Sequence, residues 1–267
     1  MTTPRLAGST FSFIWRETAI AAMRRMAAIG LNDFDVLLAP GHLWFDGSGA
    51  NGPATLRRVL EAEGLRIESL NLPALDYNLC SVVPEVRERT VEAYASAILL
   101  AADLGARGVV VVPGRVSGLL APRHEDSVGH LTDASARLVE LARAHGSHLF
   151  FESHPQTPLP TADGLGAWVS QFDRRFASIA YDVANAEFIG EDQVAAIRRW
   201  GALIGQYHLS DATRTSWRHD AIGQGTVRFG PILEAMAAQD GGSAAILEII
   251  STTPIEDMTA GMAALRR

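Results

Sequence analysis

The sequence predicts a single α/β barrel of the (β/α)8 (TIM) type. Short apolar runs alternate with longer amphipathic stretches, and this repetition favours parallel strands joined by crossovers. There are eight such runs, and 267 residues divided among eight units leave about 33 for each strand, helix and pair of loops. No long linker or low-complexity segment divides the chain, so we expect one domain over residues 1–267.

The eight expected strands are short runs rich in Val, Ile, Leu and Phe. They lie at residues 8–13, 34–39, 65–72, 108–114, 148–153, 178–183, 203–211 and 244–250. Helical patterns fill the intervals, as in the stretch that opens on Pro84 and closes on Gly105, residues suited to a helix start and end. The rival doubly wound sheet often has a glycine-rich turn after its first strand, whereas the first turn here, TFSFIWRE, contains no glycine.

The composition argues against several classes of function. A net charge of -7 and a pI near 5.6 disfavour nucleic acid or an anionic membrane as a partner. All 23 basic residues are arginines, which excludes Schiff-base aldolase, pyridoxal-phosphate and P-loop chemistry, because each relies on a lysine amine. Cys80 is the single cysteine, so neither an internal disulfide nor a thiolate metal cluster can form.

The sequence carries no signal for export or membrane insertion. The segment MTTPRLAGSTFSF lacks a basic region followed by a long apolar run, and no segment reaches the roughly 18 apolar residues of a membrane span. We therefore expect a cytoplasmic protein. Barrels of this size often pair through their outer helices, which is compatible with a homo-oligomer.

Polar residues stand at the ends of the last four expected strands, where this fold places its active-site mouth. They are Glu152, Asp182, His208 and Glu248. Strand alternation turns His208 and Glu248 into the barrel. Each residue alone would also suit a cap or a turn, but three carboxylates and an imidazole converging on a dry mouth repel one another unless a cation lies between them. We predict one divalent ion, Mn²⁺, Mg²⁺ or Co²⁺ before Zn²⁺.

Several segments of the second half of the chain resemble a known superfamily. FFESHP, YDVANAEFIGED, YHLSDATRTSWRHDAIGQGTVRFGPIL and AAILEI are similar to the xylose isomerase-like barrels, which include sugar and sugar-phosphate isomerases and epimerases. The resemblance extends from about residue 8 to residue 250. It implies that the four residues at the strand ends hold one divalent metal ion, and that Glu152 and Glu248 exchange protons with the substrate.

The resemblance also implies substrate contacts. Arg214 stands six residues after His208, where ketose epimerases carry an arginine that contacts substrate oxygens. Asn185 replaces the histidine that these epimerases carry three residues after the aspartate, so this contact differs. The related endonuclease IV holds three zinc ions and has an Asp-x-His in a loop that reads SWRHDAIGQG here, with Trp217 and Arg218 before His219. A multi-zinc site is therefore not expected.

Further residues near the expected mouth are candidate substrate contacts. His154 shares a face with Glu152 and is a candidate to orient a ligand or to contact substrate. Trp15, His42 and Trp44 follow the first two strands; an aromatic side chain there could stack on a sugar ring, or simply pack at the rim. Asp211, a residue type common in turns, could contact Arg214 or a ligand.

These features predict a divalent-metal-dependent isomerase or epimerase that acts on a sugar or sugar acid through a metal-stabilised enediolate. No run of basic residues indicates a phosphate pocket, which favours an unphosphorylated substrate. An alternative is a dehydratase of a keto-polyol, of the keto-inositol or dehydroshikimate type, with His154 or His219 protonating the leaving group. A non-catalytic metal- or ligand-binding barrel is a third interpretation. The paired glutamates argue against it, because binding alone needs no second base.

Overall fold

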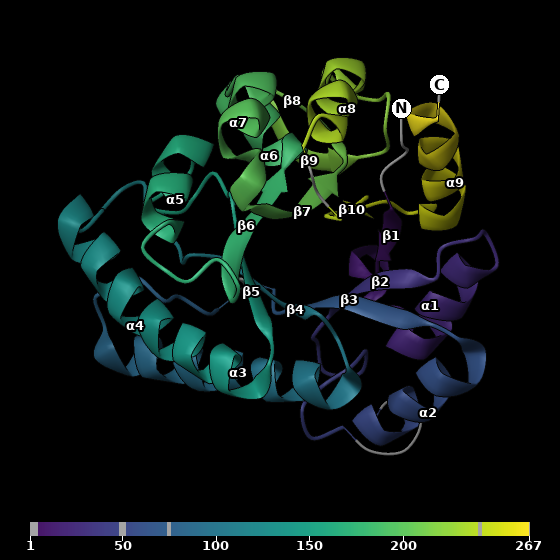
Figure 1. Cartoon of the computed structure of the whole chain (residues 1–267), viewed down its shortest axis with the longest axis horizontal. Coiled ribbons are helices and arrows are strands. Elements are labelled where there is room, and N and C mark those ends of the chain that lie inside the picture. Colours follow the sequence, from purple (N-terminus) through teal and green to yellow (C-terminus); the bar gives the residue numbers. More distant parts are fainter. Residues whose placement is uncertain (1–4, 48–51, 74–75, 240–241, 267) are drawn as a thin grey trace.

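A closed barrel of parallel strands forms the centre of the protein. The computed structural model describes residues 5–47, 52–73, 76–239 and 242–266. Within them, eight strands follow one another around the barrel in the order β1-β10-β7-β6-β5-β4-β3-β2, which confirms the predicted (β/α)8 fold. Helices form an outer layer, and the first strand lies beside β10, where the barrel closes (Figure 1). The ends of the expected domain, residues 1–4 and 267, lie outside the described residues.

The elements alternate along the chain as expected. The barrel strands are β1 (Leu6–Ser9), β2 (Asp33–Leu37), β3 (Arg66–Asn71), β4 (Gly108–Val111), β5 (His148–Glu152), β6 (Ala177–Asp182), β7 (Ile204–Leu209) and β10 (Ala244–Leu247). The helices are α1 (Ala19–Ala27), α2 (Pro53–Glu63), α3 (Pro84–Leu104), α4 (His124–His145), α5 (Ala162–Val169), α6 (Val183–Ile189), α7 (Gln193–Trp200), α8 (Phe229–Ala237) and α9 (Pro254–Leu265). Helix α3 begins at Pro84 and ends before Gly105, whose φ of 67° is the left-handed conformation that glycine adopts freely.

The first strand differs from the prediction of 8–13. Strand β1 ends at Ser9, and Phe11–Phe13 form a single 3₁₀ turn. Two hydrogen bonds of Ser12 stabilise the turn. Its Oγ donates to the carbonyl of Ile249 at 2.8 Å and accepts from the backbone N–H of Ser251 at 2.9 Å. The alternation of apolar and polar residues in TFSF, which predicted a strand, therefore belongs to a turn that is hydrogen-bonded to the segment after β10.

A hairpin that the sequence pattern did not reveal follows β7. Its strands β8 (Asp211–Thr213) and β9 (Ser216–Asp220) pair antiparallel, with Thr213 opposite Ser216. We expected a loop over these residues. The sequence carries little signal for it, because the turn residues Arg214 and Thr215 are not the Asn-Gly or other glycine-containing pair typical of two-residue hairpins.

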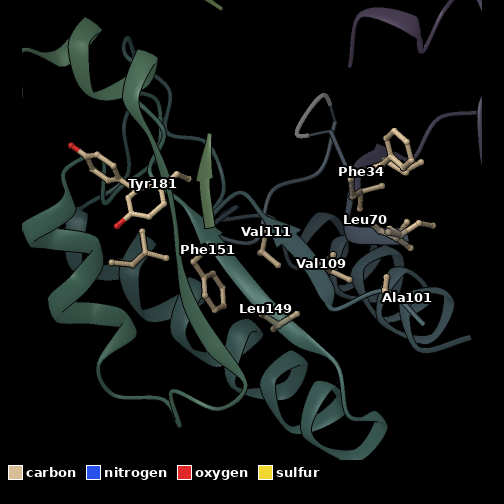
Figure 2. Close-up of a cluster of buried hydrophobic side chains, with 14 of the residues drawn as sticks. Phe34, Leu70, Ala101, Val109, Val111, Leu149, Phe151 and Tyr181 are labelled. Carbon is tan, nitrogen blue, oxygen red and sulfur yellow. The ribbon is translucent and has the colours of Figure 1, made fainter. Parts of the chain in front are cut away.

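Apolar side chains fill both the barrel interior and the layer between strands and helices. Phe150 faces inward against Val110 and Ala180, whereas its neighbours Leu149 and Phe151 face the helices. Figure 2 shows this outer layer, in which Phe151 and Leu149 from β5 lie near Val109 and Val111 from β4. The alternation also turns Glu152 inward, on the same face as Phe150.

The N-terminal end of the barrel is closed by ion pairs. Glu68 is buried and accepts hydrogen bonds from Arg5 at 2.6 Å and from Arg107 at 2.8 Å, while Arg66 donates to Asp33 at 2.8 Å. These pairs neutralise the buried carboxylates at that end of the barrel. Among the described residues, no helix combines the length and apolar character that crossing a bilayer requires.

We expect Phe151→Ala to lower the free energy of unfolding by about 3–5 kcal/mol, because the ring is fully buried and its loss leaves a cavity. Phe151 packs edge-on against Trp168, with ring centroids 5.0 Å apart. Urea unfolding followed by circular dichroism measures the change. Leu119→Ala is the control, because Leu119 is 97% exposed and its truncation should change stability by less than about 0.5 kcal/mol. Equal effects of the two substitutions would contradict the packing described here.

Candidate metal centre

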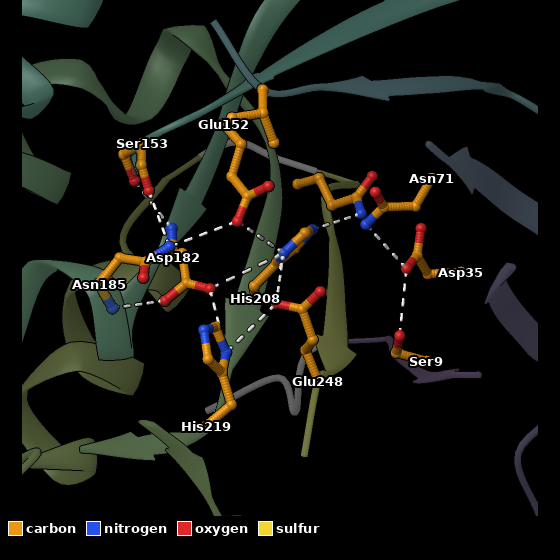
Figure 3. A network of polar contacts seen from close by, with 12 residues as sticks. Ser9, Asp35, Asn71, Glu152, Ser153, Asp182, Asn185, His208, His219 and Glu248 are labelled. Atoms are coloured by element: carbon orange, nitrogen blue, oxygen red, sulfur yellow. Dashed lines mark hydrogen bonds and ion pairs between the residues drawn. The ribbon is translucent and has the colours of Figure 1, made fainter. Parts of the chain in front are cut away.

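Four side chains able to bind a metal ion meet at the C-terminal end of the barrel (Figure 3). They come from successive strands: Glu152 ends β5, Asp182 ends β6, His208 lies in β7, and Glu248 directly follows β10. The strand register brings them together, since Asp182 pairs with His208, and His208 pairs with Ile246, two residues before Glu248. The sequence prediction of this group is thereby confirmed as a spatial cluster.

The cluster is compact and buried. Each residue offers one ligand atom, and these atoms all lie within 4.8 Å of one another. His208 Nδ1 is 3.0 Å from Glu248 Oε2 and 3.9 Å from both Glu152 Oε1 and Asp182 Oδ2. Nδ1 is therefore the ring nitrogen that faces the carboxylates.

The charges in this cluster strongly perturb one another. Burial raises the pKa of Glu152 well above its usual value and that of Asp182 to about 6. Burial alone would lower the pKa of His208, but the neighbouring carboxylates, Glu248 foremost, raise it to about 10. Burial would likewise raise the pKa of Glu248, but the charge and hydrogen bond of His208 lower it to about 2. Protons thus compensate the negative charge of the cluster, and a divalent cation would displace them.

The donor set fits a divalent ion. Asp182 Oδ1 accepts from the backbone N–H of Asn185 at 2.7 Å and so caps helix α6. Asp182 Oδ2 is buried without a hydrogen bond and faces the other ligand atoms. The residue is therefore both a helix cap and a candidate ligand. Three carboxylates with one imidazole match Mn²⁺, Mg²⁺ or Co²⁺, and zinc also accepts such ligands.

A family profile described as the xylose isomerase-like TIM barrel matches residues 23–267. The chain belongs to this family. The resemblance seen in the sequence is thereby confirmed.

Solved structures similar to this xylose isomerase-like barrel include sugar epimerases. A D-tagatose 3-epimerase-like protein superposes with a TM-score of 0.83 at 22% identity, over 98% of this chain and 96% of that one. The 3-keto-D-glucoside 4-epimerase from E. coli superposes with a TM-score of 0.78 at 16% identity, over 98% of this chain and 99% of that one. Similarity at these identities shows a shared fold.

Curated relatives bear a different activity in their names. An inosose dehydratase of Geobacillus thermodenitrificans is 23% identical over 210 residues, 68% of this chain and 68% of that protein. An inosose dehydratase of Bacillus cereus is 22% identical over 177 residues, 62% of this chain and 59% of that protein. The match therefore covers about six tenths of the length of the Bacillus cereus relative.

A chain of hydrogen bonds supports His208 from inside this xylose isomerase-like barrel. The Gln206 amide nitrogen lies 2.9 Å from His208 Nε2 and 3.2 Å from Ser69 Oγ, which in turn donates to Asp35 Oδ1 at 2.6 Å. Metal ligation through Nδ1 would place the ring proton on Nε2, which then needs an acceptor. Gln206 Oε1 is buried without a partner, and a half-turn of the amide would bring it to that proton.

The hairpin forms the outer wall of the site. His219, from β9, places Nδ1 3.5 Å from Glu248 Oε2 and 3.7 Å from Asp182 Oδ2. Trp217 Nε1 donates to Asn185 Oδ1 at 2.7 Å, and Asn185 Nδ2 is 3.3 Å from Glu152 Oε1. The buried amide of Asn185 thus connects the hairpin to a candidate ligand.

A cavity of about 490 Å³ opens onto the cluster. Its polar lining residues are Asn71, Arg115, Glu152, His154, Gln156, Arg218, His219, Asp220 and Glu248. Trp217 forms part of the wall and meets His154 edge-on, with ring centroids 4.9 Å apart. Burial is the main cause that lowers the pKa of His154 to about 4, so its ring is neutral at physiological pH.

Other candidate substrate contacts lie away from this cavity. His42 is buried, with Nδ1 2.6 Å from the carbonyl of Glu17 and Nε2 3.0 Å from Thr10 Oγ1, so both ring nitrogens serve the fold. Trp15 and Trp44 line a separate hollow. The Arg214 side chain is 68% exposed, and its Nε lies 4.0 Å from Glu187. Asp211, considered as a contact for Arg214 or a ligand, instead accepts from the backbone N–H groups of Gly223 and Val227.

Sequence reasoning did not identify Asp35, which is fully buried beside the site. Figure 3 shows it with Ser9 and Asn71 on the side of His208 that lies away from Asp182 and Asn185. Ser9 Oγ donates to Asp35 Oδ2 at 3.2 Å, and Asn71 Nδ2 is 3.4 Å from the same oxygen. The available signal was an aspartate in the middle of an apolar strand, where this residue type is uncommon.

Asp35 should make the stability of the metal-free protein depend on pH. Burial raises its pKa from 3.8 to about 6, with His208 opposing this rise and Glu248 adding to it. A carboxyl group whose pKa is higher in the folded state favours folding when protonated, and this advantage is lost as pH rises from about 4 to about 6. Asp35→Asn should therefore stabilise the protein at about pH 8, by up to about 3 kcal/mol, and give little gain at about pH 4.

Urea unfolding in the presence of a chelator, repeated across this pH range, measures the effect. Asp46→Asn is the matched control, because Asp46 is exposed. The same gain at both ends of the pH range would show that charge burial at Asp35 is not its cause.

Proposed function

We propose that the protein is a divalent-metal-dependent isomerase or epimerase of a sugar or sugar acid. The observation that carries the proposal is the division of the four candidate ligands between cavity and interior. Glu152 and Glu248 line the cavity, whereas Asp182 and His208 are completely buried and do not reach it. Asp182 and His208 would therefore serve only as ligands of the ion. The two glutamates would bind the ion and also contact the substrate.

The two glutamates differ in their affinity for a proton. Burial holds the pKa of Glu152 high, whereas the contact with His208 holds that of Glu248 low. Two carboxyl groups with opposed pKa shifts in one cavity are the usual basis for one acid and one base. We assign Glu248 as the base that removes a proton from the substrate carbon, and Glu152 as the acid that returns one.

A divalent ion at this centre would supply Lewis acidity, by polarising the substrate carbonyl and stabilising the charge of an enediolate. The chain's own groups would orient the substrate and exclude water. Asn185 fixes the Glu152 carboxyl group, and the Trp217 side chain covers the cavity wall. His219, close to both Asp182 and Glu248, is placed to hold a substrate hydroxyl.

Dehydration of a keto-polyol is the second candidate function, and the inosose dehydratases among the curated relatives favour it. The first step would be the same proton removal. His219, in the cavity wall, would then protonate a departing hydroxyl group. His154, whose ring is neutral at physiological pH, would only donate a hydrogen bond to that group. The two functions therefore share proton abstraction and differ in the step after it.

We expect the wild-type chain to bind about one Mn²⁺ ion, and Asp182→Asn to weaken that binding by at least about a hundredfold, because it removes a charged ligand. Equilibrium dialysis with elemental analysis measures both quantities. Asp192→Asn is the matched control, since Asp192 caps helix α7 as Asp182 caps α6 but lies outside the cluster. Equal affinity in the two variants would refute the metal centre, and about three ions per chain would point to an endonuclease-like site.

Proton exchange tests the roles of the glutamates. In heavy water, the Mn²⁺-loaded protein should incorporate deuterium into a ketose or ketonic sugar acid from a panel. Glu152→Gln and Glu248→Gln should each slow exchange by roughly a hundredfold or more. Glu234→Gln, an exposed change on α8, should leave the rate unchanged. A mixture of two isomeric sugars supports isomerisation, and a product lighter by one water supports dehydration. A metal-loaded protein that binds ligand without exchange would instead be a binding barrel.

A further inference from the structure

The cavity lining includes an arginine whose positive charge has no partner among the described residues. Arg115 and Arg218 are the arginines among its described lining residues. Arg218 Nε donates to Asp220 Oδ1 at 2.9 Å and is thus neutralised. The Arg115 guanidinium makes no hydrogen bond or ion pair with any described residue, although its backbone N–H and carbonyl are both bonded. Arg115 is an exposed residue, so water solvates its guanidinium, which is available to pair with an anion that enters the cavity.

The backbone of Arg115 is fixed in place. Asn78 clamps it from both sides: Asn78 Oδ1 accepts from the Arg115 N–H at 2.9 Å, and Asn78 Nδ2 donates to the Arg115 carbonyl at 2.9 Å. Gly114, with a φ of 110°, allows this approach, because a Cβ there would lie 2.6 Å from Asn78 Oδ1. The next residue, Val116, donates from its N–H to the Gln156 carbonyl at 2.8 Å. The fold therefore fixes the Arg115 Cα at the cavity rim.

A second unpaired donor lies in the same wall. The backbone N–H of Gln156 donates to His154 Nδ1 at 3.3 Å, which makes Nδ1 an acceptor and leaves the ring proton on Nε2. His154 Nε2 has no hydrogen-bond partner among the described residues, and the edge-on contact with Trp217 fixes the ring. Arg115 and His154 thus both offer N–H groups to the cavity, and no acceptor for them is found in the described part of the chain.

We propose that Arg115 and His154 form a subsite for an anionic substituent of the substrate, at the end remote from the carbonyl that meets the metal ligands. This inference rests on the proposed function and specifies its substrate class as an acidic ketose. The planar fork of a guanidinium matches the two oxygens of a carboxylate. Phosphate sites often use the N–H groups of an α-helix first turn, and none of the described lining residues belongs to one. A carboxylate is therefore the preferred anion.

The test compares ketoses that differ at one end. D-Fructose and D-tagatose serve as neutral ligands, D-fructuronate and D-tagaturonate as their carboxylates, and the two 6-phosphates as phosphorylated forms. Isothermal titration into the Mn²⁺-loaded protein gives each Kd. We expect wild type to bind a carboxylate form on the order of tenfold more tightly than its neutral counterpart, and Arg115→Met to abolish that preference with little change for the neutral sugar.

Arg198→Met is the matched control. Arg198 is exposed on helix α7 and has no acidic partner among the described residues, so its loss changes the net charge equally and should leave the preference intact. Tighter binding of the 6-phosphates that depends on Arg115 would support the anionic subsite with phosphate as its occupant. Equal affinity of neutral and anionic sugars in wild type would overturn the inference, as would a preference that survives in Arg115→Met.

The outcomes also separate this inference from the proposed function. Binding of neutral ketoses without any preference for anions overturns the subsite and leaves the isomerase proposal intact. If the metal-loaded protein binds neither class of sugar, both proposals fail. The metal affinity of Arg115→Met, measured alongside, should equal that of wild type, because Arg115 contacts none of the four candidate ligands.

Discussion

The mutual repulsion of three buried carboxylates is the constraint around which the active end of the barrel is organised. One ligand atom from each of Glu152, Asp182 and Glu248 lies within 4.8 Å of the others and of a His208 nitrogen, in an interior that screens charge poorly. Such a group is stable when protons or a cation compensate its charge. A divalent cation bound there would therefore stabilise the cluster.

The surrounding structure fixes the carboxylates instead of separating them. Asp182 caps helix α6 with one carboxylate oxygen and keeps the other free. Asn185 is hydrogen-bonded to Glu152 and also accepts a hydrogen bond from Trp217 of the hairpin. From the opposite side, Gln206 connects His208 to Ser69 and Asp35. The barrel interior, through Gln206, and the β8-β9 hairpin, through Trp217, thus both support the cluster. A change in either should alter the orientation of the candidate ligands.

Charge is distributed unequally around the cavity. Its inner surface is acidic, the imidazoles of His154 and His219 lie in the wall, and Arg115, which has no acidic partner among the described residues, lies at the rim. A substrate that brings a carbonyl to the acidic centre and an anion to Arg115 would satisfy both ends. A neutral sugar would interact with the acidic centre but would leave Arg115 without an anionic partner.

The sequence by itself determined the barrel and the four candidate ligand positions. Strand-helix alternation is a local property, and the end of a strand in this fold always faces the mouth, so Glu152, Asp182, His208 and Glu248 could be found without coordinates. They stood out because polar residues at the ends of apolar strands contrast with their neighbours.

The tertiary structure alone decided which other polar residues join them. His42 resembles a rim residue in sequence, but its ring nitrogens bond Glu17 and Thr10 within the fold. Arg115 carried no distinguishing local pattern, and the local sign of Asp35 was its position within an apolar strand. Their roles depend on partners that are distant in the chain, or on the absence of a partner among the described residues, and local periodicity cannot encode either property.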